Sequence, residues 1–203
     1  MAKVKICGLC REIDAEYANI AMPDYAGFVF AQSKRRVSAE KALWLRRELD
    51  KRITCVGVFV NEKLQTMMDI FASGCIQIVQ LHGHESPETV EQLKKEGIPV
   101  IKAIRMDERE SNALEYAAAD YLLLDNGIGG TGKLFDWNKI QNFSKPFFLA
   151  GGLSCENVLR ALQEVNPYAV DVSSGVETAG MKDKNKMIEF IRRVRTAKTE
   201  KRG

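Results

Sequence analysis

Short runs of apolar residues alternate with amphipathic stretches along the whole chain. Most runs are continuous rather than interrupted at every second residue, a pattern typical of parallel strands that helices cover on the outer face. We therefore predict eight strands, at Lys3–Cys7, Tyr25–Phe30, Cys55–Val60, Ile76–Leu81, Val100–Ile104, Tyr121–Asp125, Phe147–Ala150 and Ala169–Ser173.

The stretches between these strands have the spacing of helices with one apolar face. From Leu64 to Phe71 the apolar residues fall at i, i+3, i+4 and i+7, and similar spacing recurs in Val158–Val165 and Met187–Val194. Hydroxyl side chains that can cap a helix precede three of the helical stretches, at Ser38, Ser86 and Ser154. The weakest helical patterns are at Arg109–Ala118 and Trp137–Phe143.

The alternation of strands and helices continues without a linker or a break in composition. It predicts a single (β/α)₈ barrel domain over residues 1–203. Such barrels typically take about 250 residues and rarely fewer than about 200, so this barrel would be near the minimum length. An open, doubly wound sheet is the alternative, but it usually stops at about five or six strands.

Composition and charge narrow the range of partners. A hydrophobic content of 45% and a charged content of 28% fit a globular protein. The formal net charge of +3 is too small to indicate nucleic acid or a membrane as the main partner, and no apolar run approaches the length of a bilayer span.

Five cysteines at irregular spacing, without a signal-peptide pattern at the N-terminus, indicate reduced thiols in the cytoplasm. Since no apolar stripe demands a partner, we expect a monomer.

Polar and reactive residues gather where the predicted strands end, which is where a (β/α)₈ barrel has its active site. We expect the substrate to be bound there by Lys5, Arg35, Gln80, His82 and Asp171.

The loops after the last two predicted strands have the composition of a phosphate site. Their glycines let the backbone approach a ligand, and barrels often bind phosphate at these two loops. The residues concerned are Gly151, Gly152, Ser173, Ser174 and Gly175. Two ordinary tight turns are the alternative.

Cys7 and Asp125 are the candidate reactive pair. A thiolate can take a proton and a carboxylic acid can give one. Lys5, with Arg35 or Arg36, would supply the positive field that lowers the pKa of the thiol. Considered alone, Cys7 fits a buried barrel thiol equally well.

We predict neither a metal nor a cofactor. The two histidines, His82 and His84, are too few for a metal-dependent isomerase, and His82 fits a supporting role as well as a catalytic one. The C-x-x-C of Cys7 and Cys10 lacks both the second cysteine pair of a zinc site and a thioredoxin-like setting.

The segment GIGGTGKL at residues 127–134 nearly matches a nucleotide-binding P-loop. However, Leu134 stands where a Ser or Thr would hold magnesium, and the segment follows the sixth predicted strand rather than the first. We predict instead a lid near the substrate, to which Gly130 and Gly132 belong.

Several strings cover nearly the whole chain in order: KICG, GFVF, SKRRVS, VGVFVN, QLHG, LLLD, GGTGKLFDW, AGGL, ENV and AVDVSSGVE. Together they resemble the phosphoribosylanthranilate isomerase family of tryptophan biosynthesis. The resemblance implies a (β/α)₈ barrel that catalyses an Amadori rearrangement of a sugar phosphate without metal or cofactor.

The resemblance also implies roles for individual residues. Asp125, in LLLD, would be the general acid that protonates the furanose ring oxygen, and Cys7, in KICG, the general base that removes the C2 proton. Arg35, rather than Arg36, would contact the anthranilate end. The phosphate would be held by Gly151, Gly152, Gly175, Ser173 and Ser174.

The chain departs from the family pattern at two positions. Arg36 stands where relatives often have an aromatic residue, so the anthranilate end of the site is expected to be more basic. Cys155 stands where the helix often begins with Pro. A thiol at a helix N-terminus beside a phosphate site would be unusually acidic, readily alkylated and protected by ligand; an inert replacement for Pro is the alternative.

Two rival functions remain at this stage. A histidine-pathway isomerase performs the same rearrangement, but it uses an aspartate on the first strand, where this chain has Cys7, and it needs a longer chain. A non-catalytic barrel that binds a sugar phosphate or a partner protein would not need Cys7, Asp125 and Arg35 together.

Overall fold

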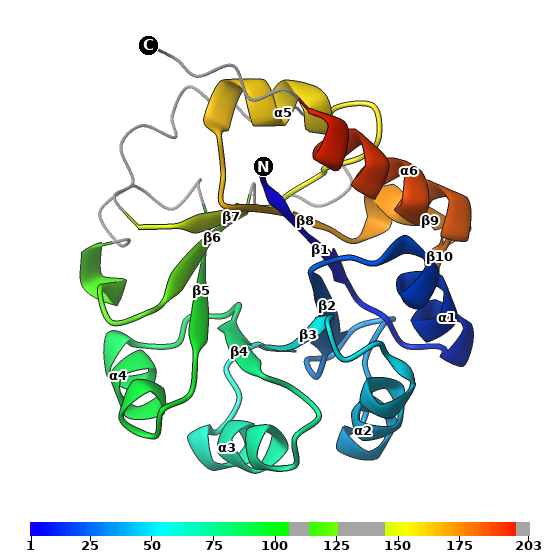
Figure 1. Ribbon diagram of the computed structural model, residues 1–203. Coiled ribbons are helices and arrows are strands. Elements are labelled where there is room, and N and C mark those ends of the chain that lie inside the picture. The colour runs from blue at the N-terminus through cyan, green and yellow to red at the C-terminus, as the bar shows by residue number, and fades with distance from the viewer. Residues whose placement is uncertain (106–113, 126–144, 198–203) are drawn as a thin grey trace.

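Eight parallel strands, hydrogen-bonded in chain order, close into a barrel with β8 beside β1. The computed structural model describes residues 1–105, 114–125 and 145–197. The strands are β1 Lys3–Cys7, β2 Tyr25–Val29, β3 Thr54–Phe59, β4 Ile78–Leu81, β5 Val100–Arg105, β6 Tyr121–Asp125, β7 Phe147–Leu149 and β8 Ala169–Val172. In Figure 1 the strands form the inner ring and the helices surround it. The predicted (β/α)₈ architecture is confirmed.

Six α-helices cover the described part of the barrel: α1 Glu12–Ala21, α2 Ala39–Glu48, α3 Leu64–Ala72, α4 Pro87–Lys95, α5 Val158–Val165 and α6 Lys184–Thr196. Two 3₁₀ turns and a short antiparallel hairpin were not predicted: η2 Leu114–Tyr116, η4 Ser174–Val176, and the strands β9 Glu177–Thr178 and β10 Met181–Lys182. Of the two weak helical patterns, Arg109–Ala118 yields only η2 within the described residues, and Trp137–Phe143 lies outside them.

Several predicted bounds differ from the structure by one or two residues. β3 begins at Thr54, β4 begins at Ile78, and β8 ends at Val172. Ile76 is buried although it precedes β4, so an apolar run extends beyond the hydrogen-bonded strand that it contains.

The helix starts follow the predicted caps only in part. The Ser38 side chain accepts a hydrogen bond from the Lys41 N–H and caps α2. Ser86 precedes α4 but makes no capping hydrogen bond. The Ser154 hydroxyl accepts from the Glu156 N–H, but α5 begins later than predicted, at Val158, because the Ser154 N–H donates to Asn157 Oδ1 at 2.9 Å and closes a turn first.

The core has two layers. Alternate strand residues face the helices in a large apolar cluster, while a second cluster of side chains from seven strands, Tyr25, Val56, Ile78, Ile101, Ala103, Leu123, Phe148, Ala150 and Ala169, fills the barrel interior. Tyr25, Phe148 and Tyr168 pack together within this interior layer, where the Tyr25 and Tyr168 hydroxyls lie 3.0 Å apart.

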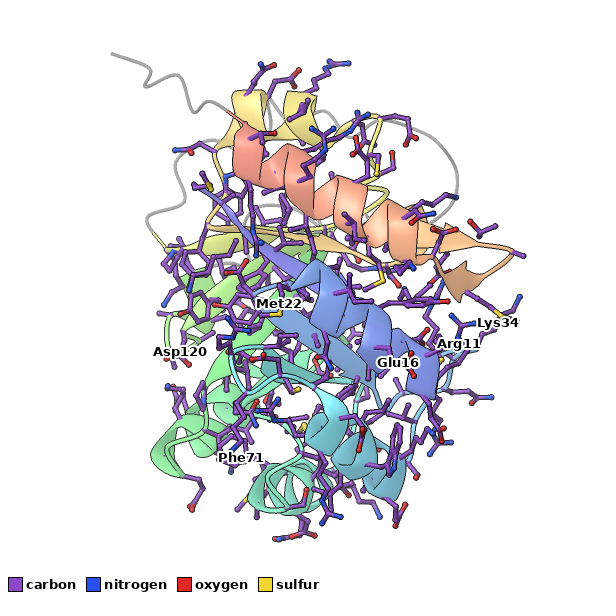
Figure 2. The ribbon with its side chains drawn as sticks, turned by 45° about the vertical axis from the view of Figure 1, so that its right-hand side comes forward. Arg11, Glu16, Met22, Lys34, Phe71 and Asp120 are labelled. Carbon is purple, nitrogen blue, oxygen red and sulfur yellow. The ribbon has the colours of Figure 1, made fainter. Side chains whose placement is uncertain are left out.

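The carboxyl end of the barrel is polar. Four buried polar side chains come from its strands, Lys5, Gln80, Lys102 and Asp171. Figure 2 shows Arg11 and Lys34, which follow β1 and β2, at one end of the molecule, away from Asp120, which precedes β6. The fold therefore gathers the residues that follow the strands at one end.

The described helices include none that is both long enough and apolar enough to cross a bilayer.

The two faces of α6 give a matched test of the core. Ile191 is 2% exposed and Ile188 is 36% exposed on the same helix. We expect Ile191→Ala to lower the free energy of unfolding by about 2–5 kcal/mol, because it leaves a cavity, and Ile188→Ala to lower it by less than about 1 kcal/mol. Urea denaturation of both variants measures the difference; equal losses would contradict the packing.

Candidate active site

The end of β1 brings a thiol, an ammonium group and a carboxylate together. Lys5 is fully buried, and its Nζ donates to Asp171 Oδ1 on the neighbouring β8 at 2.9 Å. A Cβ atom added to Gly27 would lie 2.9 Å from Cys7 Sγ and 3.2 Å from Lys5 Nζ, so both side chains converge over this glycine on β2. The absence of a side chain at Gly27 provides the space that Cys7 and Lys5 occupy.

The electrostatics of Cys7 differ from the sequence prediction. Burial raises the pKa of the Cys7 thiol, and Asp171 raises it further, while Lys5 and Lys182 act against them. The predicted lowering therefore does not appear. The main reason is burial of the thiol; in addition, Asp171 offsets the charge of Lys5, and Arg35 is committed to another carboxylate.

That carboxylate belongs to Glu177 on β9. Arg35 Nε donates to Glu177 Oε1 at 2.7 Å and its Nη2 to Oε2 at 2.6 Å, a bidentate pair. Lys182 on β10 donates to the same carboxylate and to the Ser173 carbonyl oxygen. Although burial acts to raise the pKa of Glu177, hydrogen bonds from Arg35 and Lys182 lower it. Glu177 and Lys182 therefore hold Arg35 in place.

A glycine makes room for Arg35 over β1. Gly8 has φ +83, and a Cβ atom there would lie 2.4 Å from Arg35 Cδ. Arg35, Gly8, Lys34, Glu177 and Lys182 all line a cavity of 250 Å³. Arg36, in contrast, is exposed, and the expected effect of its charge on the site stays a prediction.

Asp125, at the end of β6, faces His82, which follows β4. The two side chains are 24% and 28% exposed, and His82 Nε2 lies 3.1 Å from Asp125 Oδ2. The other ring nitrogen, Nδ1, lies 2.8 Å from the side-chain nitrogen of Gln80, a fully buried residue of β4. His82 and Asp125 line a second cavity, of 490 Å³, together with Lys102 and Arg105.

A buried ion pair stabilises the loop that carries His82. Lys102 and Glu85 are each 2% exposed and are joined at 2.8 Å, and Lys102 also donates to the Gly83 carbonyl oxygen. Glu85 accepts further hydrogen bonds from the Asn61 and Gly83 N–H groups. These contacts fix the backbone that follows His82.

The loops after β7 and β8, which carry the predicted phosphate site, contact one another. Gly151 and Gly152 have φ +89 and +69, and a Cβ atom on Gly175 would lie 1.9 Å from the Leu153 carbonyl oxygen. This contact therefore requires glycine at position 175. The Ser173 hydroxyl donates to the Cys7 carbonyl oxygen at 3.0 Å, which ties this loop to the end of β1.

Cys155 is not the acidic thiol that we expected. It lies before α5 rather than in its first turn, is 9% exposed, and its Sγ donates to the Lys186 carbonyl oxygen at 3.6 Å. Burial raises its pKa, as does the neighbouring Glu156. The prediction of ready alkylation loses its physical basis, because the helix dipole acts at the helix terminus and the thiol is enclosed.

The structure thus brings most of the predicted site residues to one end of the barrel. Gly130 and Gly132 lie outside the described residues. Within the described ranges no cluster of three or more His, Cys, Asp or Glu side chains forms a metal site. Four supporting residues were missed by the sequence analysis, Glu85, Lys102, Glu177 and Lys182. The sequence does contain a signal for Lys102, because this lysine is the single charged residue within the apolar run VIKAI.

Comparisons with known proteins agree on one family. Residues 4–193 match the family model of N-(5'phosphoribosyl)anthranilate (PRA) isomerase. The chain is 46% identical over 201 residues to N-(5'-phosphoribosyl)anthranilate isomerase from Endomicrobium trichonymphae, covering 97% of this chain and 100% of the relative.

Solved structures give the same result. A phosphoribosyl anthranilate isomerase from Thermotoga maritima superposes with a TM-score of 0.87 at 39% identity, covering 96% of this chain and 99% of the other. A phosphoribosyl anthranilate isomerase in complex with reduced 1-(o-carboxyphenylamino)-1-deoxyribulose 5-phosphate superposes with a TM-score of 0.84 at 37% identity, with the same coverage. By sequence and by structure, this chain belongs to the phosphoribosylanthranilate isomerase family, whose members act in tryptophan biosynthesis.

Proposed function

We propose that this isomerase converts N-(5-phosphoribosyl)anthranilate to 1-(o-carboxyphenylamino)-1-deoxyribulose 5-phosphate, with Asp125 as general acid and Cys7 as general base. The observation that carries this proposal is the placement of the two groups. They lie at the carboxyl ends of β6 and β1, and the loops of β7 and β8 lie between them in the ring of strands. A sugar phosphate held by those loops would have an acid on one side and a base on the other.

The chemistry begins with two proton transfers at protein side chains. Asp125 donates a proton to the furanose ring oxygen as the bond from that oxygen to C1 breaks, and the nitrogen lone pair forms the C1=N bond of a protonated Schiff base. The Cys7 thiolate then removes the proton from C2, the electron pair of that bond forms C1=C2, and the C1=N pair returns to nitrogen. The resulting enolamine takes a proton at C1 while its C2 hydroxyl loses one, and it becomes the ketone. Each transfer needs a donor or acceptor within hydrogen-bond reach of the reacting atom.

The remaining residues bind and orient the substrate. Arg35 is directed to the anthranilate carboxylate, for which a guanidinium group is well suited. The phosphate is held by Gly151, Gly152, Ser173, Ser174 and Gly175. Around Cys7, the positive charge of Lys5 and the negative charge of Asp171 offset each other. Gly130 and Gly132 remain candidates for a lid, a prediction that falls outside the described residues.

The proposal also covers the number of domains, the oligomeric state and the location of the protein. We propose that residues 1–203 form one domain that acts as a monomer in the cytoplasm. The exposed large apolar side chains, among them Ile20, Leu159 and Ile188, are spread over several helices and do not demand a partner subunit. Light scattering of the purified chain would test the monomer.

Removal of either reactive group tests the mechanism. We expect Cys7→Ala and Asp125→Asn each to lower kcat by about 10²–10⁴-fold, the usual contribution of one acid or base, with the fold intact by circular dichroism. Loss of the fluorescence of phosphoribosylanthranilate, generated in situ, measures the rate. Asp69→Asn, on the exposed side of α3, is the matched control. Near-normal turnover in either active-site variant would refute its role, and substrate binding without turnover by the unaltered protein would indicate a non-catalytic barrel.

The pH dependence of Cys7 gives a test with a defined sign. Because burial raises its pKa, alkylation by iodoacetamide should increase only as the pH rises above the ordinary range of thiols, about 8.5. Lys5→Met removes a cation that favours the thiolate and should move the curve to higher pH. Asp171→Asn removes an anion that opposes it and should move the curve to lower pH. Peptide mapping reports the labelling rate of each cysteine, and shifts in the same direction would contradict the assigned electrostatics.

Glu177 tests the placement of Arg35. We expect Glu177→Gln to raise KM about tenfold with kcat nearly unchanged, because Arg35 loses its bidentate partner and must be ordered by the substrate instead. Glu164→Gln, which breaks a surface pair with Arg160, is the control and should change neither constant. A lower KM would show that Glu177 competes with the substrate for Arg35, which contradicts a positioning role.

A further inference from the structure

If Asp125 is the general acid, its carboxylate must receive a new proton after each turnover. A carboxylic acid of aspartate in water holds its proton only below about pH 4, whereas a general acid must carry one near the working pH. Asp125 must therefore be protonated again before each turnover, and the chain beside it contains a group that can do this.

His82 is in contact with Asp125 on one side and with Gln80 on the other. Its Nε2 lies 3.1 Å from Asp125 Oδ2, and its Nδ1 lies 2.8 Å from Gln80 Nε2. The ring is 28% exposed, so it can exchange a proton with water from the cavity that it lines. Gln80, in contrast, is fully buried. The three side chains form a chain of contacts from buried Gln80 through His82 to Asp125.

Gln80 carries an unpaired buried atom. Within the described residues, its Oε1 is the single buried side-chain oxygen or nitrogen without a hydrogen-bond partner. The two ends of a glutamine amide have the same shape, and their assignment depends on the hydrogen bonds around them. Rotating the amide by half a turn places Oε1 against His82 Nδ1, where it accepts an N–H, and moves the amide nitrogen to the position that Oε1 held. An imidazole with a proton on Nδ1 then presents Nε2 to the carboxyl group.

We propose that Gln80, through Oε1, fixes a proton on Nδ1 of His82, and that His82 Nε2 and Asp125 share one further proton and so return Asp125 to its acid form. Gln80 and His82 are then positioning residues that act through Asp125, rather than substrate-binding residues as the sequence predicted. This role rests on the proposed function of Asp125 as the acid.

The proton count of the relay balances. Asp125 gives its proton to the ring oxygen and becomes a carboxylate, which accepts the proton on His82 Nε2. The neutral ring then takes a proton from the solvent at Nε2, and the solvent regains one when the Cys7 thiol gives up the proton taken from C2, while Nδ1 keeps its proton bonded to Gln80. No electron transfer and no further reactant is involved.

The charges around the pair come from several elements. From β5, Lys102 and Arg105 face the cavity, and the charge of Lys102 is offset by Glu85. Tyr116 and His84 also line it, while the residues that follow β3 there, Val60 and Asn61, are not ionisable. β7, beside β6, consists of Phe147, Phe148 and Leu149 and adds no charge. Among the described residues, Asp125 is thus the carboxylate in direct contact with the ring.

Nitrogen-15 NMR of the folded chain tests the proton on Nδ1 directly. The chain has two histidines, so the signals of His82 are identified by their persistence in His84→Asn. In the active pH range we expect His82 Nδ1 to be protonated and its Nε2 signal to move in Asp125→Asn. An unprotonated Nδ1 throughout that range, accepting from the Gln80 amide, would overturn the proposal. This measurement needs no turnover, so it stays separate from an assay that shows Asp125→Asn to be active and thereby refutes the acid itself.

The pH profile of kcat tests the effect on the reaction. We expect His82→Asn to lower kcat about tenfold or more and to shift one limb of the profile toward lower pH by about one unit, with KM within twofold. Gln80→Met should shift the same limb in the same direction, and Gln80→Glu, which restores an acceptor at Nδ1, should bring it back. A limb that stays in place in all three variants, whatever the rate, would contradict the relay, because a merely structural role lowers the rate without moving the profile.

Discussion

The pairing of the first strand with the last is the constraint on which the site depends. β1 and β8 are in parallel register with Lys5 opposite Asp171, and their side chains form an ion pair inside the barrel. This closure places Cys7, at the start of the chain, beside the loop that follows β8. Cys7 and the proposed phosphate loops are far apart along the chain, and this closure is what brings them close in space. The pair is buried and tightly hydrogen-bonded, so loss of one partner would leave an uncompensated charge.

Small residues determine how closely the functional side chains can approach one another. Gly27 gives space to Cys7 and Lys5, Gly8 gives space to Arg35, and Gly175 allows the last two loops to touch. In each case the glycine belongs to a different strand or loop from the group that needs the space. The site therefore depends on residues without functional groups as well as on reactive side chains.

Sequence reasoning succeeded in placing residues where the fold determines their position. Cys7 and Asp125 were expected at strand ends because each ends an apolar run, and strand ends meet at one end of a barrel. It failed where the partner is distant in sequence: Glu177 lies 142 residues from Arg35, and no local pattern connects them. Cys155 was misjudged because a capping serine before an apolar stretch does not reveal that Asn157 closes a turn first. Contacts formed by folding decide such cases, and a single sequence does not contain them in readable form.

The hairpin β9–β10 supports Arg35 from outside the barrel sheet. Its two strands of two residues each are hydrogen-bonded to one another and are not part of the barrel sheet, yet they carry both Glu177 and Lys182, which hold Arg35. Its turn contains Ala179 and Gly180, both at positive φ. Exchange of this short segment would transfer the support of Arg35 and leave all eight barrel strands unchanged. The orientation of Arg35 can therefore change through a hairpin that the barrel does not need in order to close.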